Sequence, residues 1–224
     1  MKKYIILAMV TLLMSSCAEQ ITRLAQYPKM YEEKPLSIAV MPPINQTNFV
    51  EAKDYFYTTL YAPLCEKGYY VYSPMMTMEM FQAESAYDAE QFIEADLSPF
   101  RKVLGADAAM FTIIKSWKRS KIGGSLTAGV EYILRSTKTG ETLYRREGLI
   151  SVDTSVHSGG AGLFGALVDI AATAINTAAT DKIVAGRKCT LFVLSDMPEG
   201  KYGTKFDKDQ TLPAGKSYIK ATVK

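Results

Sequence analysis

The chain has 224 residues, of which 48% are hydrophobic and 22% charged, and its formal net charge is +3. These values are typical of a globular protein of about one domain, and they exclude a wholly disordered or collagen-like chain. Lys2 and Lys3 supply two of the three excess positive charges, and no acidic residue precedes Cys17. The rest of the chain is therefore nearly neutral, which argues against nucleic-acid binding.

The first sixteen residues have the pattern of a secretory signal peptide. Two lysines precede an apolar run over residues 4–14, and two serines stand just before Cys17. The run is shorter than the ~20 apolar residues that a membrane-spanning helix needs. Residues 13–17, Leu-Met-Ser-Ser-Cys, resemble the cleavage site of a bacterial lipoprotein signal. That resemblance implies cleavage before Cys17, a diacylglyceryl group on its sulfur and a further acyl chain, such as palmitate, on its new amine. A plain signal peptide with an incidental Cys17 is the alternative.

Several acyl chains give stable membrane anchoring, whereas one chain binds only marginally. In enterobacteria an Asp after the acylated cysteine usually retains a lipoprotein at the inner membrane, so Ala18 favours the outer membrane. We expect the protein on its periplasmic face. Residues 17–35 are polar, contain two prolines and have no sustained period. They predict a lipid-anchored tether, whose reach of about 20–25 Å would hold the domain off the membrane.

Between residues 36 and 195, short apolar runs alternate with stretches of helical period, which predicts a single α/β domain. We expect Pro63 to kink or divide the first helix, because proline lacks an N–H. A short connection with Gly140 joins two alternating runs as a hairpin, so the predicted architecture is a mixed sheet with helices packed on it. The predicted strands are 36–41, 69–73, 108–117, 126–136, 141–154 and 190–194, and the predicted helices are 51–67, 75–83, 89–104 and about 162–185.

The remaining residues, 196–224, are rich in glycine, proline, lysine and aspartate, which predicts a loosely packed tail with a short strand near Tyr218. Its paired carboxylates, Asp207 and Asp209, are expected to be solvated. Two further cysteines, Cys65 and Cys189, permit one disulfide in an oxidising compartment. Each can equally be a buried small apolar residue, and both interpretations stay open.

Residues 160–165, Gly-Ala-Gly-Leu-Phe-Gly, fit the G-x-G-x-x-G pattern of a dinucleotide site. The preceding strand alternates polar and apolar residues, whereas the first strand of a nucleotide-binding fold is usually buried on both faces. The acidic residue Asp196 follows the last glycine by about 30 positions rather than the ~20 of the fingerprint. We therefore interpret the motif as a glycine hinge and predict no cofactor. The single histidine, His157, cannot form a paired-histidine metal site, so we predict neither a metal nor a catalytic residue.

Two regions are candidates for a partner interface. The first is a tyrosine-rich stretch that includes Tyr55, Tyr57 and Tyr61, because tyrosine combines a large apolar ring with a polar tip. The second is the broad apolar face of the alanine-rich helix after the glycine hinge, which could also meet a second copy of the chain. Packing into the core is the alternative for both regions. The residues of the second face are Phe164, Val168, Ala171 and Ile175.

Four segments together resemble a known family. They are residues 36–48, 63–71, 104–108 with Trp117, and 137–141, which include Met-Pro-Pro-Ile-Asn and Glu-Lys-Gly-Tyr-Tyr-Val. They are similar to a family of Gram-negative lipoproteins of unknown function typified by a neisserial surface antigen, over about residues 1–195. More distantly, the order of elements is similar to the amino-terminal domain of TolB and the periplasmic domain of the curli-secretion channel lipoprotein. These resemblances imply a non-catalytic α/β domain in an envelope assembly, with a partner that resembles the curli channel lipoprotein.

The sequence therefore predicts a lipid-anchored accessory or scaffold component of an envelope transport or secretion complex, which is not an enzyme. The first alternative is a periplasmic carrier of a small molecule or lipid, with a pocket near residues 159–165. An enzyme that uses His157 is the third possibility and the least supported, because no nucleophile elbow accompanies this histidine.

Overall fold

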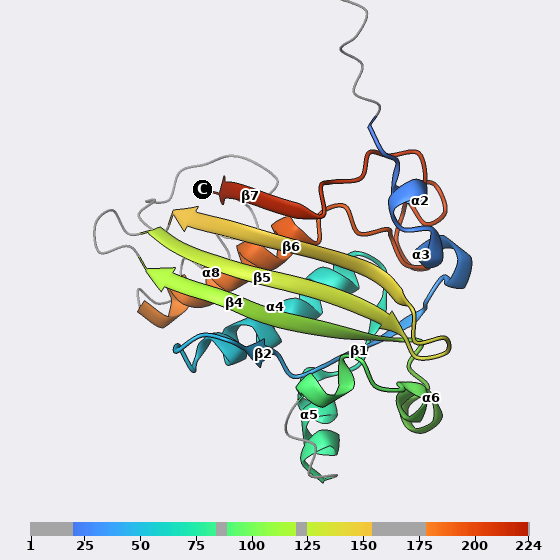
Figure 1. Cartoon of the computed structure of the whole chain (residues 1–224), viewed down its shortest axis with the longest axis horizontal. Helices are drawn as coiled ribbons and strands as arrows, with labels where there is room; N and C mark the ends of the chain where they lie inside the picture. Colours follow the sequence, from blue (N-terminus) through green and yellow to red (C-terminus); the bar gives the residue numbers. More distant parts are fainter. Residues whose placement is uncertain (1–19, 84–88, 120–124, 154–177, 224) are drawn as a thin grey trace, which may run out of the picture.

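The computed structural model describes residues 20–83, 89–119, 125–153 and 178–223 (Figure 1). Its centre is a seven-stranded mixed sheet in the order β3-β1-β4-β5-β6-β7, with β2 paired to β4 beside this path. β4 and β5, and β5 and β6, are antiparallel, and the other pairs are parallel. The predicted fold class is thus confirmed. The strands are β1 Ser37–Val40, β2 Ile44–Asn45, β3 Tyr70–Val71, β4 Ala108–Arg119, β5 Ser125–Ser136, β6 Thr142–Asp153 and β7 Tyr218–Val223.

Helices cover both faces of the sheet. Neighbouring residues of β4 belong to different apolar clusters: Met110 packs in the cluster under α4 and α8, and Phe111 in the cluster under α5 and η1. Because successive side chains of a strand point to opposite faces, the two clusters lie on opposite sides of the sheet. Figure 1 shows α4 and α8 together behind it. The helices are α2 Arg23–Gln26, α3 Pro28–Glu33, α4 Ala52–Glu66, α5 Pro74–Ala83, η1 Ala89–Phe92, α6 Ser98–Leu104 and α8 Ala178–Val193.

Helix α4 forms where the sequence predicts it. Phe56, Leu60 and Leu64 recur every four residues, and all three are fully buried against the sheet. The prediction that Pro63 divides the helix is wrong, because α4 continues to Glu66. Pro63 stands in the last turn, where its missing N–H removes only one helical hydrogen bond.

The predicted strand at 190–194 is also wrong, because α8 runs through it to Val193. A short apolar run cannot by itself distinguish a strand from a buried helix. The deciding signal is the spacing of Ala185, Cys189 and Val193, which recur every four residues and are all fully buried. Most of the predicted helix 162–185 lies outside the described residues, and its described part, from residue 178, is helical.

The predicted helix 89–104 is divided into η1 and α6. Asp96 stands in the gap and accepts hydrogen bonds from the backbone N–H and the hydroxyl of Ser98, while Pro99 stands in the first turn of α6. Proline is favoured in the first turn of a helix and disfavoured inside one, so it marks a new start. The hairpin prediction is confirmed, with Gly140 in its connection at a positive φ of 74°.

Both ends of the described chain are more ordered than the sequence predicts. From residue 20 on, the expected flexible tether is replaced by α2 and α3, whose region buries Tyr27 and Met30. The expected loose tail buries Met197 and Asp209 completely, and it ends in β7, which confirms the short strand near Tyr218. These two ends pack on each other, as described next.

Candidate functional site

The segment that opens the described chain is paired with the segment that leads to β7. The backbone N–H of Arg23 donates to the Leu212 carbonyl at 2.9 Å, and that of Leu24 donates to the Gln210 carbonyl at 3.1 Å. The N–H of Ala214 donates back to the Ile21 carbonyl at 2.8 Å. We call residues 20–35 and 194–216 together the N-terminal junction. Its backbone pairing begins at Ile21, the residue after Gln20.

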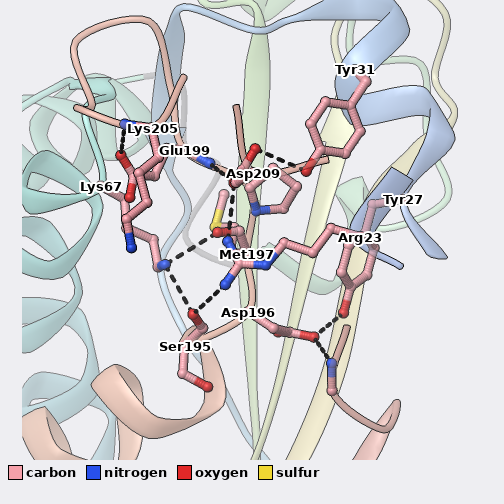
Figure 2. A network of polar contacts seen from close by, with 12 residues as sticks. Arg23, Tyr27, Tyr31, Lys67, Ser195, Asp196, Met197, Glu199, Lys205 and Asp209 are labelled. Carbon is pink, nitrogen blue, oxygen red and sulfur yellow. Dashed lines mark hydrogen bonds and ion pairs between the residues drawn. The ribbon is translucent and has the colours of Figure 1, made fainter. Parts of the chain in front are cut away.

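Asp209 is the first centre of this junction (Figure 2). Its carboxylate is fully buried and lies 3.0 Å from the Arg23 guanidinium. The Tyr31 hydroxyl donates to Oδ1 and the backbone N–H of Glu199 donates to Oδ2, each at 3.0 Å. Burial, reinforced by the Asp209 charge, raises the pKa of the Tyr31 hydroxyl, which therefore stays protonated as a donor. The carboxylate ties α2 and α3 to the chain after α8.

Asp196 is the second centre. Its carboxylate accepts hydrogen bonds from the Arg146 guanidinium at 2.7 Å, the Tyr27 hydroxyl at 2.7 Å and the Gly215 N–H at 2.8 Å. The Tyr144 hydroxyl lies 3.1 Å from Oδ1. Burial, and then Asp196, raise the pKa values of both tyrosine hydroxyls. A β-carbon on Gly215 would stand 1.9 Å from Arg146 Nη2, so only glycine lets the chain approach this closely.

Lys67, the residue after α4, fastens the same segment from the other side. Its ammonium donates to the carbonyl oxygens of Met197 at 3.1 Å and Ser195 at 3.3 Å. Burial lowers the pKa of this ammonium to about 8. Such a lowered pKa also occurs at catalytic lysines, but the Lys67 ammonium is bonded to carbonyl groups, and Lys67 lines neither the cleft beside Tyr31 and Glu199 nor the cleft beside Glu33 and Asp107. Its role here is to hold residues 195–197.

A cleft of about 280 Å³ lies between α3, the start of β4 and the β5–β6 connection. Several of its charged groups have partners: Arg101 lies 3.1 Å from Asp107, and Glu33 accepts hydrogen bonds from the Ser136 and Thr139 hydroxyls. Among the described residues, no three histidine, cysteine or acidic side chains are grouped to hold a metal ion. The cleft is a polar surface depression.

A second grouping lies at the other end of the sheet. The rings of Phe49 and Trp117 stack at 5.7 Å, and those of Tyr55 and Trp117 stack at 5.9 Å. The Lys182 ammonium stands 4.8 Å above the Phe49 ring, a cation–π distance. Beside this aromatic cluster, Val50 is 81% exposed. All three rings are half-buried, so each keeps a part that is open to contact.

The aromatic cluster and the N-terminal junction are separated by the length of β4. At one end of this strand Ala108 pairs with Ser136, whose hydroxyl donates to Glu33 of α3. Trp117 lies nine residues further, which is about 30 Å in an extended strand. The two groupings therefore occupy opposite ends of the domain, as Figure 1 shows for α3 and the end of β4.

Comparison with known proteins gives a family. Residues 25–199 match the family described as "Putative lipoprotein GNA1162-like". The chain belongs to this family. A curated relative, "Putative lipoprotein NMB1124/NMB1162" of Neisseria meningitidis serogroup B, is 26% identical over 184 residues, which cover 81% of this chain and 85% of the relative. The match to the family begins inside α2, so α3 is part of the family domain rather than a linker before it.

One solved structure supports the fold, and a second is more distant. The crystal structure of lipoprotein GNA1162 from Neisseria meningitidis superposes with a TM-score of 0.51 and 23% identity, covering 62% of this chain and 96% of that one. A PelC dodecamer from Paraburkholderia phytofirmans gives a TM-score of 0.41 and 14% identity, over 75% of this chain and 91% of that one. The resemblance to the neisserial lipoprotein family is thus confirmed.

The structure separates the three tyrosines that the sequence predicts as one interface. Tyr55 joins the aromatic cluster, whereas Tyr57 is buried and its hydroxyl donates to the Pro74 carbonyl. Tyr61 is 41% exposed. Cys65 and Cys189 are free thiols, so the disulfide that the sequence left open is not formed in this structure.

Several predicted features lie outside the described residues. They are Cys17, His157, the glycine hinge 160–165, and Phe164, Val168, Ala171 and Ile175. Within the described ranges, no helix is both long and apolar enough to span a bilayer. From the sequence, Asp196 is considered only as the acidic residue of the dinucleotide pattern, and Asp209 is expected to be solvated. In the structure both are buried at the junction. Their acidic character alone gives no signal of burial, because their partners come from distant parts of the chain.

Proposed function

We propose that this family member is an outer-membrane lipoprotein, anchored through acylated Cys17, whose domain works on the periplasmic side as a non-enzymatic accessory or scaffold of an envelope transport or secretion complex. The family of lipoproteins and the signal pattern before Cys17 support the anchor. The observation that carries the scaffold role is the N-terminal junction. Through this junction, the segment that follows the anchor belongs to the folded domain. The aromatic cluster lies about 30 Å from the junction, at the other end of β4.

The aromatic cluster is the surface that we assign to a protein partner. Exposed parts of stacked aromatic rings are typical of the centre of protein interfaces, where they bury large area with little loss of side-chain freedom. The partner is an envelope protein, and the family resemblance favours one similar to the curli-secretion channel lipoprotein. The alanine-rich face with Phe164, Val168, Ala171 and Ile175 stays part of the proposed interface, as does contact with a second copy of the chain.

The chemistry of the described residues supports a non-enzymatic role. Asp196 and Asp209 are saturated with hydrogen bonds from the domain itself. A general acid or base must instead reach a substrate proton, directly or through one water. The carrier alternative placed its pocket near residues 159–165, outside the described chain. The cleft of about 280 Å³ does not favour it for a lipid, because charged side chains line it.

Site-specific crosslinking in intact cells tests the proposed function. A photo-crosslinking amino acid replaces Val50, which is 81% exposed beside the aromatic cluster, or Met75 of α5, which is 72% exposed and serves as the matched control. We expect one envelope protein, identified by mass spectrometry, to crosslink at position 50 and not at position 75. Adducts of equal kind and amount at both positions, or none at position 50, would contradict the partner surface. Labelling with palmitate, with Cys17→Ser as control, reports separately on the anchor.

A further inference from the structure

We propose that the N-terminal junction rests on the bilayer itself, so that the domain stands on the membrane in one orientation. This inference depends on the proposed acylation of Cys17. Only three residue steps separate Cys17 from Gln20, the first described residue, and a fully extended chain covers at most about 11 Å in that distance. The flexible reach expected from the sequence, about 20–25 Å, would have let the domain turn freely.

The distance between Cys17 and the folded domain stays short because the hydrogen bonds and ion pairs of the N-terminal junction are buried and numerous. Arg23 combines an ion pair to a fully buried Asp209 with a backbone hydrogen bond to Leu212. Tyr27, four residues further, is held by Asp196 at 2.7 Å. Releasing more chain would expose these groups without their partners, which is costly for buried polar side chains. The anchor therefore draws this end of the domain to the bilayer.

The surface nearest the anchor suits the membrane interface. Ile21 and Leu24 lie in the described segment closest to Cys17, and their side chains are 57% and 43% exposed. Exposed aliphatic side chains at a bilayer boundary bury apolar area among the headgroups and upper acyl chains. If this end of the domain faced only water, the exposure of these two side chains would contribute no stabilisation. Their position immediately after the anchor gives them an apolar medium to enter.

The charge of the junction surface also favours contact with a bilayer. The strip 210–214, which pairs with residues 21–24, is flanked by Lys208 and Lys216. Both lysines are exposed, and within the described chain neither side chain makes an ion pair. Of the neighbouring acids, Asp209 is paired with Arg23 and Asp207 with Lys34, whereas Glu199 accepts a hydrogen bond from the Lys205 backbone and makes no ion pair in the described chain. Exposed lysines outnumber this one carboxylate over residues 199–216, so the net charge there is positive, and anionic lipid headgroups attract such lysines within a Debye length.

Fluorescence quenching on vesicles tests the orientation. The acylated full chain carries Cys65→Ser and a single fluorophore at Leu24→Cys or, as control, at Val50→Cys; Cys189 is fully buried. The vesicles contain phosphatidylethanolamine, phosphatidylglycerol and a lipid with a nitroxide on its headgroup. We expect several-fold stronger quenching at position 24 than at position 50. Equal quenching of a protein that sediments with the vesicles would overturn the orientation while leaving the anchor intact, whereas failure to sediment would remove the anchor and the inference together.

Charge reversal tests the lysines. Lys208→Glu combined with Lys216→Glu should lose the extra quenching at position 24 that anionic vesicles give over vesicles with phosphatidylcholine in place of phosphatidylglycerol. The matched control is Lys118→Glu, an exposed lysine at the far end of β4, which should keep that difference. If the double variant also keeps it, the basic surface does not contact the bilayer and the proposal is wrong.

Discussion

Replacing Asp196 by Asn tests whether the N-terminal junction is held by its buried ion pair. The side chains of Arg146 and Asp196 are only 5% and 7% exposed, and they lie 2.7 Å apart. The amide of asparagine has no charge to balance the guanidinium. One of its two positions also becomes a donor, facing the N–H of Gly215 or the guanidinium, which are donors themselves. The variant thus leaves a buried cation without its partner.

Breaking a buried pair in this way costs about 3–5 kcal/mol. That is a large part of the ~5–15 kcal/mol by which domains are usually stable. The matched control is Arg145→Met on the same strand, whose guanidinium is 63% exposed and lies 2.6 Å from Glu131. Glu131 keeps Lys115 at 2.8 Å after this change. Because Arg145 is largely exposed and the buried Glu131 stays paired with Lys115, the control should lose clearly less stability than Asp196→Asn.

Urea unfolding followed by the fluorescence of Trp117, the single tryptophan, measures both variants. Because Trp117 lies at the opposite end of the sheet, its signal reports unfolding of the whole domain rather than local loss of α2 and α3. A double variant, Arg146→Met with Asp196→Leu, should recover only part of the stability, because it removes both charges but leaves the Tyr27 hydroxyl and the Gly215 N–H without their acceptor. A loss below about 1 kcal/mol for Asp196→Asn, equal to that of Arg145→Met, would refute the reasoning.

Two further predictions concern the same region. Folding lowers the pKa of Lys67 from 10.5 to about 8, so between these values the unfolded chain holds a proton that the folded chain has released. The unfolding free energy of the native chain should therefore rise from pH 8 to 9.5 relative to Lys67→Met, but not relative to the exposed control Lys102→Met; a constant difference contradicts this. Gly68 has a φ of 84°, and a β-carbon on it would stand 2.0 Å from the backbone N of Gly203, so Gly68→Ala should cost more than about 2 kcal/mol in urea unfolding. Gly140 has a similar φ of 74°, but its β-carbon would meet only Arg135 Nη2 at 3.4 Å, so Gly140→Ala should cost about 1 kcal/mol. Equal losses would show that the chain moves apart at little cost.

The sequence predicts the central sheet well because its signals are local. The hairpin of β5 and β6 shows alternation and a glycine-containing connection within about thirty residues, and β1 shows an apolar run ended by two prolines. The prediction fails at the last helix, α8, because the local signal there is ambiguous. The run Thr190–Leu194 has the composition of a strand, and only its spacing with Ala185 and Cys189 favours a helix. Tertiary packing follows this spacing rather than the composition.

The N-terminal junction could not be predicted from local patterns. Arg23 and Asp209 are 186 positions apart, and Tyr27 and Asp196 are 169 positions apart. Each residue taken alone lies in a polar stretch with prolines, which is the composition of a linker. Burial here comes from contacts between the two ends of the chain, and such contacts leave no period in either segment. The family match from residue 25 is consistent with α3 as part of the domain.

The consequence concerns how an anchor and a domain are coupled. With a flexible tether, a pull on Cys17 would first extend the linker, and the position of the aromatic cluster would vary by the reach of that linker. In this structure a force on Cys17 would be transmitted by two contacts, Arg23 with Asp209 and Tyr27 with Asp196. The ion pair of Asp196 with Arg146 would transmit it further, to β6. The hydrogen-bonded sheet then carries it to the far end of the domain. An acylated Cys17 would thus fix the height of the aromatic cluster above the bilayer to within the about 11 Å of free chain. A partner anchored in the same membrane, as we propose, would then find this surface at a nearly constant height.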